Sequence, residues 1–287
     1  MNTIIQRYRH PVAFYVAATA VPWAFWFVAG RISHRALGGQ ETAIASALAF
    51  AGLLAPMVVA FIAIARDREL RTDALSRLTL KGITPGYAAI ACLTMLASIL
   101  LAQAISLLFG YSPRQFVITG HYTFTSGVFP VWFLLIAAPV VEELAWHSYG
   151  TDALRARFNL FLTSIIFAAY WAVWHVPLAG IKGYYHANLV VGGALYGINF
   201  LVSVFPFVIL MNWLYCRTGR NILVACVFHI TANYFNEIFA THPDSKVIQT
   251  GLLLVLAGMV VGKNRELFFA REFEQEGLNE RSCQLVH

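Results

Sequence analysis

Long apolar blocks separated by short polar segments dominate the chain. A membrane core of about 30 Å takes roughly 20 consecutive apolar residues per helical crossing, and eight blocks approach or exceed that length. The blocks are continuous rather than alternating, which favours helices over the strands of a membrane barrel. The sequence therefore predicts an all-α, polytopic integral membrane protein, a single helical bundle over residues 1–287 with about eight transmembrane helices. The blocks are residues 11–30, 43–65, 87–110, 126–145, 159–180, 188–215, 222–240 and 248–262.

The composition supports a lipid environment. Hydrophobic residues make up 59% of the chain and charged residues 12%, with a mean hydropathy of +0.66. An average soluble domain has about 25% charged residues. No small-residue cleavage site follows the first block, so we expect it to remain as an uncleaved first span.

The net charge of +6 could suggest a nucleic-acid partner, but its distribution favours a topological origin. If both termini are cytoplasmic, 15 of the 20 basic residues fall on the cytoplasmic side, as the positive-inside rule requires. We therefore predict no nucleic-acid partner and expect a plasma membrane protein, of the bacterial inner-membrane type, with both termini cytoplasmic. The 15 are Arg7, Arg9, Arg66, Arg68, Arg71, Arg77, Lys81, Arg155, Arg157, Arg217, Arg220, Lys263, Arg265, Arg271 and Arg281.

The basic segment 66–85 allows two interpretations. Its sequence, RDRELRTDALSRLTLKGITP, is compatible with an amphipathic stretch lying at the membrane interface. A plain basic loop is an equally good interpretation.

Ionisable side chains inside the apolar blocks are the best indicators of function. A charge at the bilayer centre costs roughly 3 kcal/mol on insertion scales, so such residues usually face a cavity and have a role. Three stretches carry them. They are PVVEELAWHSYG with Glu142, Glu143 and His147, AAYWAVWHVPL with His175, and VACVFHITANYF with His229 and Asn233.

Helix geometry predicts that these residues meet. Glu142 and His175 lie 16 and 17 residues from a turn at about residue 158, so each is roughly 25 Å from it along an antiparallel hairpin. His229 and Asn233 are four residues apart and share one helix face. A count from the start of its helix puts His229 only about 13 Å deep, shallower than the hairpin pair. This mismatch leaves open which membrane face the cavity opens to.

Such a set contains the groups that peptide hydrolysis needs. A carboxylate or an imidazole can take a proton from water, and imidazole and amide groups can donate to the oxyanion of a tetrahedral intermediate. Alternatively, Glu142, His175 and His229 are candidate ligands for Zn²⁺ with an open position for water. The residues alone do not separate these two mechanisms.

At these positions the chain resembles the CAAX prenyl endopeptidase type 2 family, also called CPBP intramembrane peptidases or the Abi family. The family pattern is EExxxR, then an aromatic residue followed four residues later by His, then HxxxN or HxxxB, each on a successive core helix. The matching segments here are Glu142–His147, Trp171–His175 and His229–Asn233. The resemblance covers roughly residues 126–240, which we expect to form the catalytic core helices.

The resemblance implies an intramembrane endopeptidase that cuts a membrane-bound peptide or a lipidated protein. It implies that Glu142 and His175 activate water and that His229 and Asn233 form an oxyanion hole or bind metal. Glu143 would support them. The cofactor implied is either Zn²⁺ or none.

One position departs from the family pattern, because His147 stands where the family usually has Arg. Histidine can hold a neighbouring carboxylate ionised only when the imidazole is protonated, so the exchange could weaken catalysis. The alternative function is therefore a non-catalytic immunity or scaffold protein with a decayed site. A proton-coupled transporter ranks behind it. Together with His147, Trp146 and Trp171 are candidates to line the substrate cavity. Glu237 continues the helix face of Asn233 and favours a structural interpretation.

Overall fold

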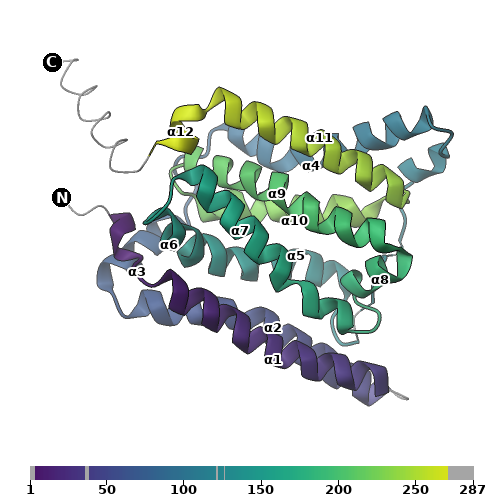
Figure 1. The fold of residues 1–287 in the computed structure, drawn as a ribbon, viewed down its shortest axis with the longest axis horizontal. Coiled ribbons are helices and arrows are strands. Elements are labelled where there is room, and N and C mark those ends of the chain that lie inside the picture. Colours follow the sequence, from purple (N-terminus) through teal and green to yellow (C-terminus); the bar gives the residue numbers. More distant parts are fainter. Residues whose placement is uncertain (1–3, 36–38, 121, 126, 271–287) are drawn as a thin grey trace.

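The computed structural model describes residues 4–35, 39–120, 122–125 and 127–270 (Figure 1). Arg271 and Arg281, counted above among the basic residues, lie outside the described residues. In Figure 1 the long helices lie side by side, with α3 (Arg68–Ser76) and α12 (Arg265–Phe269) at one end of the bundle and α8 (Tyr185–Gly192) at the other. We call these ends the terminal face and the α8 face.

Seven helical stretches in the described residues are long and apolar enough to cross a membrane, and α10 is a shorter apolar helix beside them. The seven stretches are α1 (Pro11–Arg35), α2 (Gly39–Ala65), α4 (Pro85–Leu107), α5 with η3 and α6 (Val131–Ala145, Trp146–Gly150, Thr151–Arg155), α7 with η4 (Leu160–Trp174, Val176–Gly180), α9 (Ala194–Arg217) and α11 (Pro243–Lys263). The shorter helix α10 spans Ile222–Ile238. The short elements are η1 (Ile4–Arg7), α3 (Arg68–Ser76), η2 (Pro113–Phe116), α8 (Tyr185–Gly192) and α12 (Arg265–Phe269).

The prediction of an all-α membrane bundle with about eight spans is confirmed. The predicted block 248–262 lies within the 21-residue helix α11, whose polar first residues are not part of the apolar block. Pro243 occupies the first turn, where its missing N–H is tolerated, and the His242 side chain accepts a hydrogen bond from the backbone N–H of Asp244. The shorter apolar helix α10 has 17 residues.

Polar caps define where several helices begin. Asn159 caps α7, Asn221 caps α10 and Thr84 caps α4, each by accepting a hydrogen bond from a backbone N–H in the first turn. Asp67 caps α3 in the same way. In this helix Leu70 and Ala74 are buried, so the middle of the segment 66–85 is an amphipathic helix rather than a plain loop.

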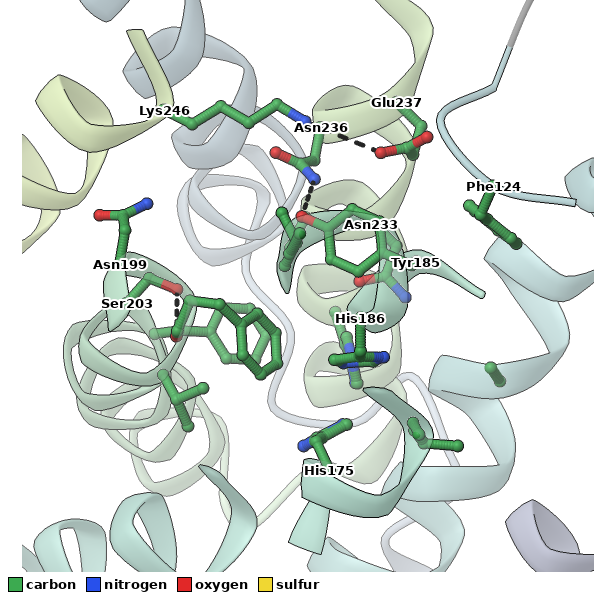
Figure 2. A pocket seen from close by; sticks show the side chains of 18 of the residues that line it. Phe124, His175, Tyr185, His186, Asn199, Ser203, Asn233, Asn236, Glu237 and Lys246 are labelled. Atoms are coloured by element: carbon green, nitrogen blue, oxygen red, sulfur yellow. Dashed lines mark hydrogen bonds and ion pairs between the residues drawn. The ribbon is translucent and has the colours of Figure 1, made fainter. Parts of the chain in front are cut away.

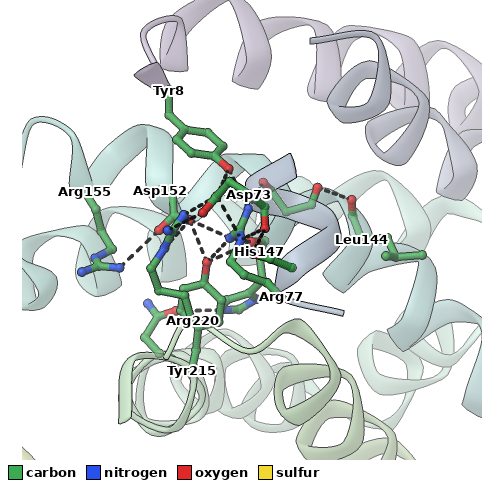
Figure 3. Close-up of polar contacts among 12 residues, drawn as sticks. Tyr8, Asp73, Arg77, Leu144, His147, Asp152, Arg155, Tyr215 and Arg220 are labelled. Atoms are coloured by element: carbon green, nitrogen blue, oxygen red, sulfur yellow. Dashed lines mark hydrogen bonds and ion pairs between the residues drawn. The ribbon is translucent and has the colours of Figure 1, made fainter. Parts of the chain in front are cut away.

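A buried ionic network joins the segments of the terminal face (Figure 3). Arg77 donates to the Asp152 carboxylate at 2.8 Å and to the backbone carbonyl of His147 at 3.0 Å. Arg220 bridges Asp152 and Asp73 at 2.6 and 2.9 Å. The network links α3 and the start of α10 to the helix that carries the two adjacent glutamates.

Candidate functional site

A cavity of about 260 Å³ lies in the half of the bundle nearer the α8 face. Its wall comes from α5, the end of α7, α8, the starts of α9 and α11, and the later part of α10. Five of the predicted site residues line it: Glu142, Trp171, His175, His229 and Asn233. The structure therefore brings the residues of all three motifs to one cavity.

Glu142 faces this cavity from the middle of the α5–α6 span. Its Oε2 accepts a hydrogen bond from the indole Nε1 of Trp171 at 2.9 Å and a longer one from Trp146 Nε1 at 3.4 Å. The carboxylate is 7% exposed. The contact with Trp171, four residues before His175, places α5 and α7 in the register that the hairpin count predicts.

Glu143 has different surroundings, although it is the next residue. It is fully buried and is not among the described residues that line the cavity. Its two oxygens contact the Nδ1 atoms of two imidazoles, His229 at 2.7 Å and His147. A carboxylate without a proton only accepts hydrogen bonds, so both imidazoles donate to it.

The contact with Glu143 shows that His229 reaches the depth of the hairpin pair. The simple count placed it too shallow because it assumed that α10 begins at the membrane surface. Asn221 and Ile222, at the start of α10, are only 2% and 0% exposed. Asn221 Nδ2 also donates to the backbone carbonyls of Thr79 and Lys81, in the segment that covers this helix end. The start of α10 is thus buried within the protein, and the contact with Glu143 places His229 beside the two glutamates.

His147 and Trp146 lie behind the cavity wall, which differs from the prediction that they line it. Both are fully buried and neither is among the described lining residues. The helix widens into the π-helical turn η3 at Trp146. The Trp146 indole packs edge-on against Trp174, with ring centroids 5.3 Å apart. The His147 ring follows Glu143 toward α9 and its Nε2 lies 2.9 Å from Asn212 Oδ1.

The neighbours of Asn212 determine how His147 is protonated. Ser164 donates its hydroxyl to the Leu160 carbonyl, so its Oγ accepts from Asn212 Nδ2 at 2.9 Å. This turns the Asn212 carbonyl oxygen toward His147, and His147 Nε2 must then carry a proton. Its Nδ1 contacts Glu143, so His147 occupies the place of the family arginine beside this carboxylate.

His175 ends α7 with one ring nitrogen engaged. Its Nδ1 lies 2.6 Å from the Trp171 backbone carbonyl, which can only accept, so Nδ1 carries the proton and Nε2 is left as an acceptor. The ring stacks on His186 of α8, with centroids 5.0 Å apart and planes inclined by 26°.

His186 is a cavity residue that the sequence analysis missed. It lies outside the apolar blocks, so the search for ionisable groups in spans passed over it. Its position 11 residues after His175, in a short segment between two spans, was the available signal. Burial, and to a smaller extent His175, lowers the pKa of His186 well below its ordinary value, so we treat the ring as neutral. Burial, with a smaller contribution from Glu142, raises the pKa of the adjacent Tyr184 to about 12.

Asn233 and Glu237 follow His229 at successive helical turns, and both line the cavity. Glu237 is 3% exposed and accepts hydrogen bonds from the backbone N–H and the hydroxyl of Thr123, at 2.9 and 2.8 Å. This carboxylate therefore anchors the loop before α5, in line with the structural interpretation, and it also borders the cavity.

The ligand set considered for Zn²⁺ fits only in part. The Nδ1 atoms of His175 and His229 are held by a carbonyl and by a carboxylate, which is how metal-binding histidines are usually oriented. Among the described residues, however, no group of three His, Cys, Asp or Glu side chains is placed to hold one metal ion. The arrangement does not fit a three-ligand zinc site, and no reaction step is derived through a metal.

Comparison with known proteins adds a family relationship to this geometry. The sequence model described as type II CAAX prenyl endopeptidase Rce1-like matches residues 124–235. The CAAX prenyl protease 2 of Methanococcus maripaludis is 32% identical over 272 residues, which cover 93% of this chain and 99% of the relative. The matched region contains the three motifs that line the cavity.

Proposed function

Because this chain belongs to the type II CAAX prenyl endopeptidase family, we propose that it hydrolyses a peptide bond in the prenylated, membrane-associated C-terminal segment of a substrate. A CAAX segment is a C-terminal motif whose cysteine carries the prenyl chain. The observation that supports the proposal is that the Glu142 side chain lines the same cavity as His175, His229 and Asn233.

The proposed first step is the attack of water on the scissile carbonyl. Glu142 takes a proton from water while Trp171 holds its Oε2, and the bare Nε2 of His175 orients the same water. The water oxygen bonds to the carbonyl carbon, and the carbonyl electron pair moves onto its oxygen. A low-dielectric cavity strengthens the interactions that act on this charge.

His229 and Asn233 are proposed to stabilise the resulting oxyanion. Glu143 accepts from His229 Nδ1 at 2.7 Å and so favours the doubly protonated ring, whose Nε2 can donate into the cavity. The Asn233 amide would be the second donor. Glu142 then returns its proton to the leaving nitrogen as the C–N bond breaks, which yields an acid and a free amine.

The experiment is cleavage of a fluorogenic prenylated CAAX-type peptide by purified protein, with and without a chelator. Glu142→Gln removes the proposed base and should lower kcat by at least about 100-fold. Glu41→Gln, an exposed carboxylate in the first turn of α2, is the matched control and should leave kcat unchanged. We expect the chelator to leave turnover unchanged. Loss of turnover on chelation would show that the reaction depends on a metal ion. Equal turnover by Glu142→Gln and wild type would overturn the assignment.

The alternative of a non-catalytic scaffold is not favoured. It was based on His147 in the place of the family arginine. In the structure Glu143 still receives two N–H donors, from His147 and His229, so the exchange does not leave this carboxylate without partners.

We also propose an orientation. The basic residues gather on the terminal face, and on the positive-inside rule this face is cytoplasmic. The cavity would then open toward the opposite, α8 face.

A further inference from the structure

One cation lies at the outer end of the cavity. Of the described residues that line it, Lys246 is the one lysine or arginine. It belongs to the first turn of α11, and its side chain is 15% exposed. A cation kept largely out of water inside a membrane protein is costly, which by default indicates a functional role.

The neighbours of Lys246 hold its ammonium group without using up its hydrogen bonds (Figure 2). Its Nζ lies 3.7 Å from Glu237 Oε1, beyond hydrogen-bond distance, and 5.9 Å from the centre of the Tyr185 ring. The Glu237 carboxylate is instead hydrogen-bonded by Thr123. The ammonium group is thus placed beside the cavity with donors left for a further acceptor.

The distance of Lys246 from the catalytic level matches a short peptide. Glu237 lies eight residues beyond His229 on α10, which is about 12 Å of helix. A CAAX segment has three residues after its cysteine, and three extended residues span at most about 10 Å. A chain whose scissile bond lies beside Glu142 can therefore bring its terminal carboxylate close to Lys246.

The polarity of the cavity wall favours the same orientation of the substrate, with its C-terminal carboxylate at the Lys246 end. Figure 2 shows Asn233 and Asn236 on the wall between the histidines and Lys246, with Asn236 Nδ2 donating to Tyr185 OH at 3.1 Å. A terminal carboxylate is more stable at the outer end, near water and a cation, than at mid-membrane.

We propose that Lys246 binds the free C-terminal carboxylate of the substrate and thereby determines how far the chain end enters the cavity and which bond reaches Glu142. This inference rests on the proposed function. By binding the carboxylate, the ammonium group selects substrates whose chain ends a fixed short distance beyond the cleaved bond. Longer tails and blocked termini should bind poorly.

The test compares one prenylated peptide with a free C-terminal acid and with a C-terminal amide. Wild type should cleave the acid about 10- to 100-fold better in kcat/KM, the range expected for a charged hydrogen bond, and mainly through KM. In Lys246→Met the acid-to-amide ratio should fall toward one, and Lys246→Arg should retain part of it. Lys182→Met, an exposed lysine of the same face outside the cavity lining, should keep the wild-type ratio.

A binding measurement separates this inference from the proposed function. In a Glu142→Gln background, fluorescence titration with the two peptides should show the same preference for the acid and its loss on adding Lys246→Met. An unchanged preference in folded Lys246→Met protein overturns the role of Lys246. Absence of cleavage by wild type together with a Lys246-dependent preference in binding would overturn the peptidase proposal alone.

Discussion

Two adjacent glutamates of one helix have separate environments. Glu142 faces the cavity and accepts from indole N–H groups, whereas Glu143 is buried between two imidazoles. Neighbouring residues on a helix point about 100° apart, so one can face the cavity while the other contacts His229 on α10. The Glu–Glu pair therefore provides one proposed base and one buried support for His229.

Replacing His147 tests that support. His147→Ala removes one donor to Glu143 and leaves the Asn212 carbonyl unpartnered, so we expect kcat to fall about 10- to 100-fold. His147→Arg should recover part of the loss, because a guanidinium is always charged. The measurement is kcat on the prenylated peptide, with exposed His10→Ala as control. If His147→Ala matched wild type in kcat, Glu143 would not need this partner.

Trp171→Phe isolates a single hydrogen bond to the proposed base. The phenyl ring can keep the stacking on Phe167 and Phe207, while Glu142 loses its 2.9 Å donor. We expect kcat to fall about tenfold, with a small change in melting temperature. Trp174→Phe is the matched control, since its indole donates to the Ala18 carbonyl and not to Glu142. A larger loss of kcat in the control would argue for general loosening of α7.

At the scale of whole elements, the close approach of the Trp26 side chain of α1 to the backbone of α2 determines how these two helices pack. Gly52 lies against the Trp26 indole, which donates to the Ala49 carbonyl at 3.0 Å, and a Cβ at this glycine would lie 2.5 Å from Trp26 Nε1. Gly52→Ala should therefore destabilise the protein by about 1–3 kcal/mol through overpacking. Gly251→Ala in α11 meets nothing within 4 Å and should be neutral or slightly stabilising. Melting temperatures in one detergent compare the two, and equal values would show that the α1–α2 contact can relax.

Arg77, at the end of α3, connects this helix to the rest of the bundle. Its side chain is 3% exposed and that of its partner Asp152 is 0% exposed. Burial acts against the charge, but Tyr215 and Asp152 keep the pKa of Arg77 above its ordinary value. Arg77→Met should cost about 3–5 kcal/mol, as expected when one partner of a buried pair is removed. Arg71→Met, an exposed arginine of α3, should cost less than 1 kcal/mol. Thermal unfolding measures both, and similar losses would mean that Arg220 can replace Arg77.

The spans could be predicted from the sequence because lipid imposes a strong and simple rule on helix length. Counting residues along a hairpin also predicted that Glu142 and His175 lie level with each other, and both line the cavity. The depth of His229 and the burial of His147 could not be predicted, because they depend on tertiary contacts. The depth of His229 depends on the burial of the start of α10. The burial of His147 depends on the π-helical turn after Ala145. His186 was missed because polar residues between spans are too common to be a signal on their own.

For the molecule as a whole, both described chain ends lie on the face opposite the cavity (Figure 1). The orientation in the membrane therefore decides which compartment supplies the substrate. Basic residues predict a cytoplasmic terminal face, so the cavity should be reached from the other side of the membrane. A substrate made in the cytoplasm would then have to cross or enter the membrane before cleavage, whereas a substrate anchored in the outer leaflet would not.

Cysteine labelling in intact cells tests this orientation. In a background with Cys92, Cys216, Cys226 and Cys283 replaced by serine or alanine, a single cysteine is placed at Arg114 or at Arg68, which are exposed on opposite faces. A membrane-impermeant thiol reagent should label Arg114→Cys in intact cells and Arg68→Cys only after permeabilisation. The reverse pattern would place the termini outside and the cavity toward the cytoplasm, where soluble enzymes could deliver a prenylated chain end directly. Since the fold fixes the cavity and the termini on opposite faces, either pattern assigns the compartment in which Lys246 meets its ligand.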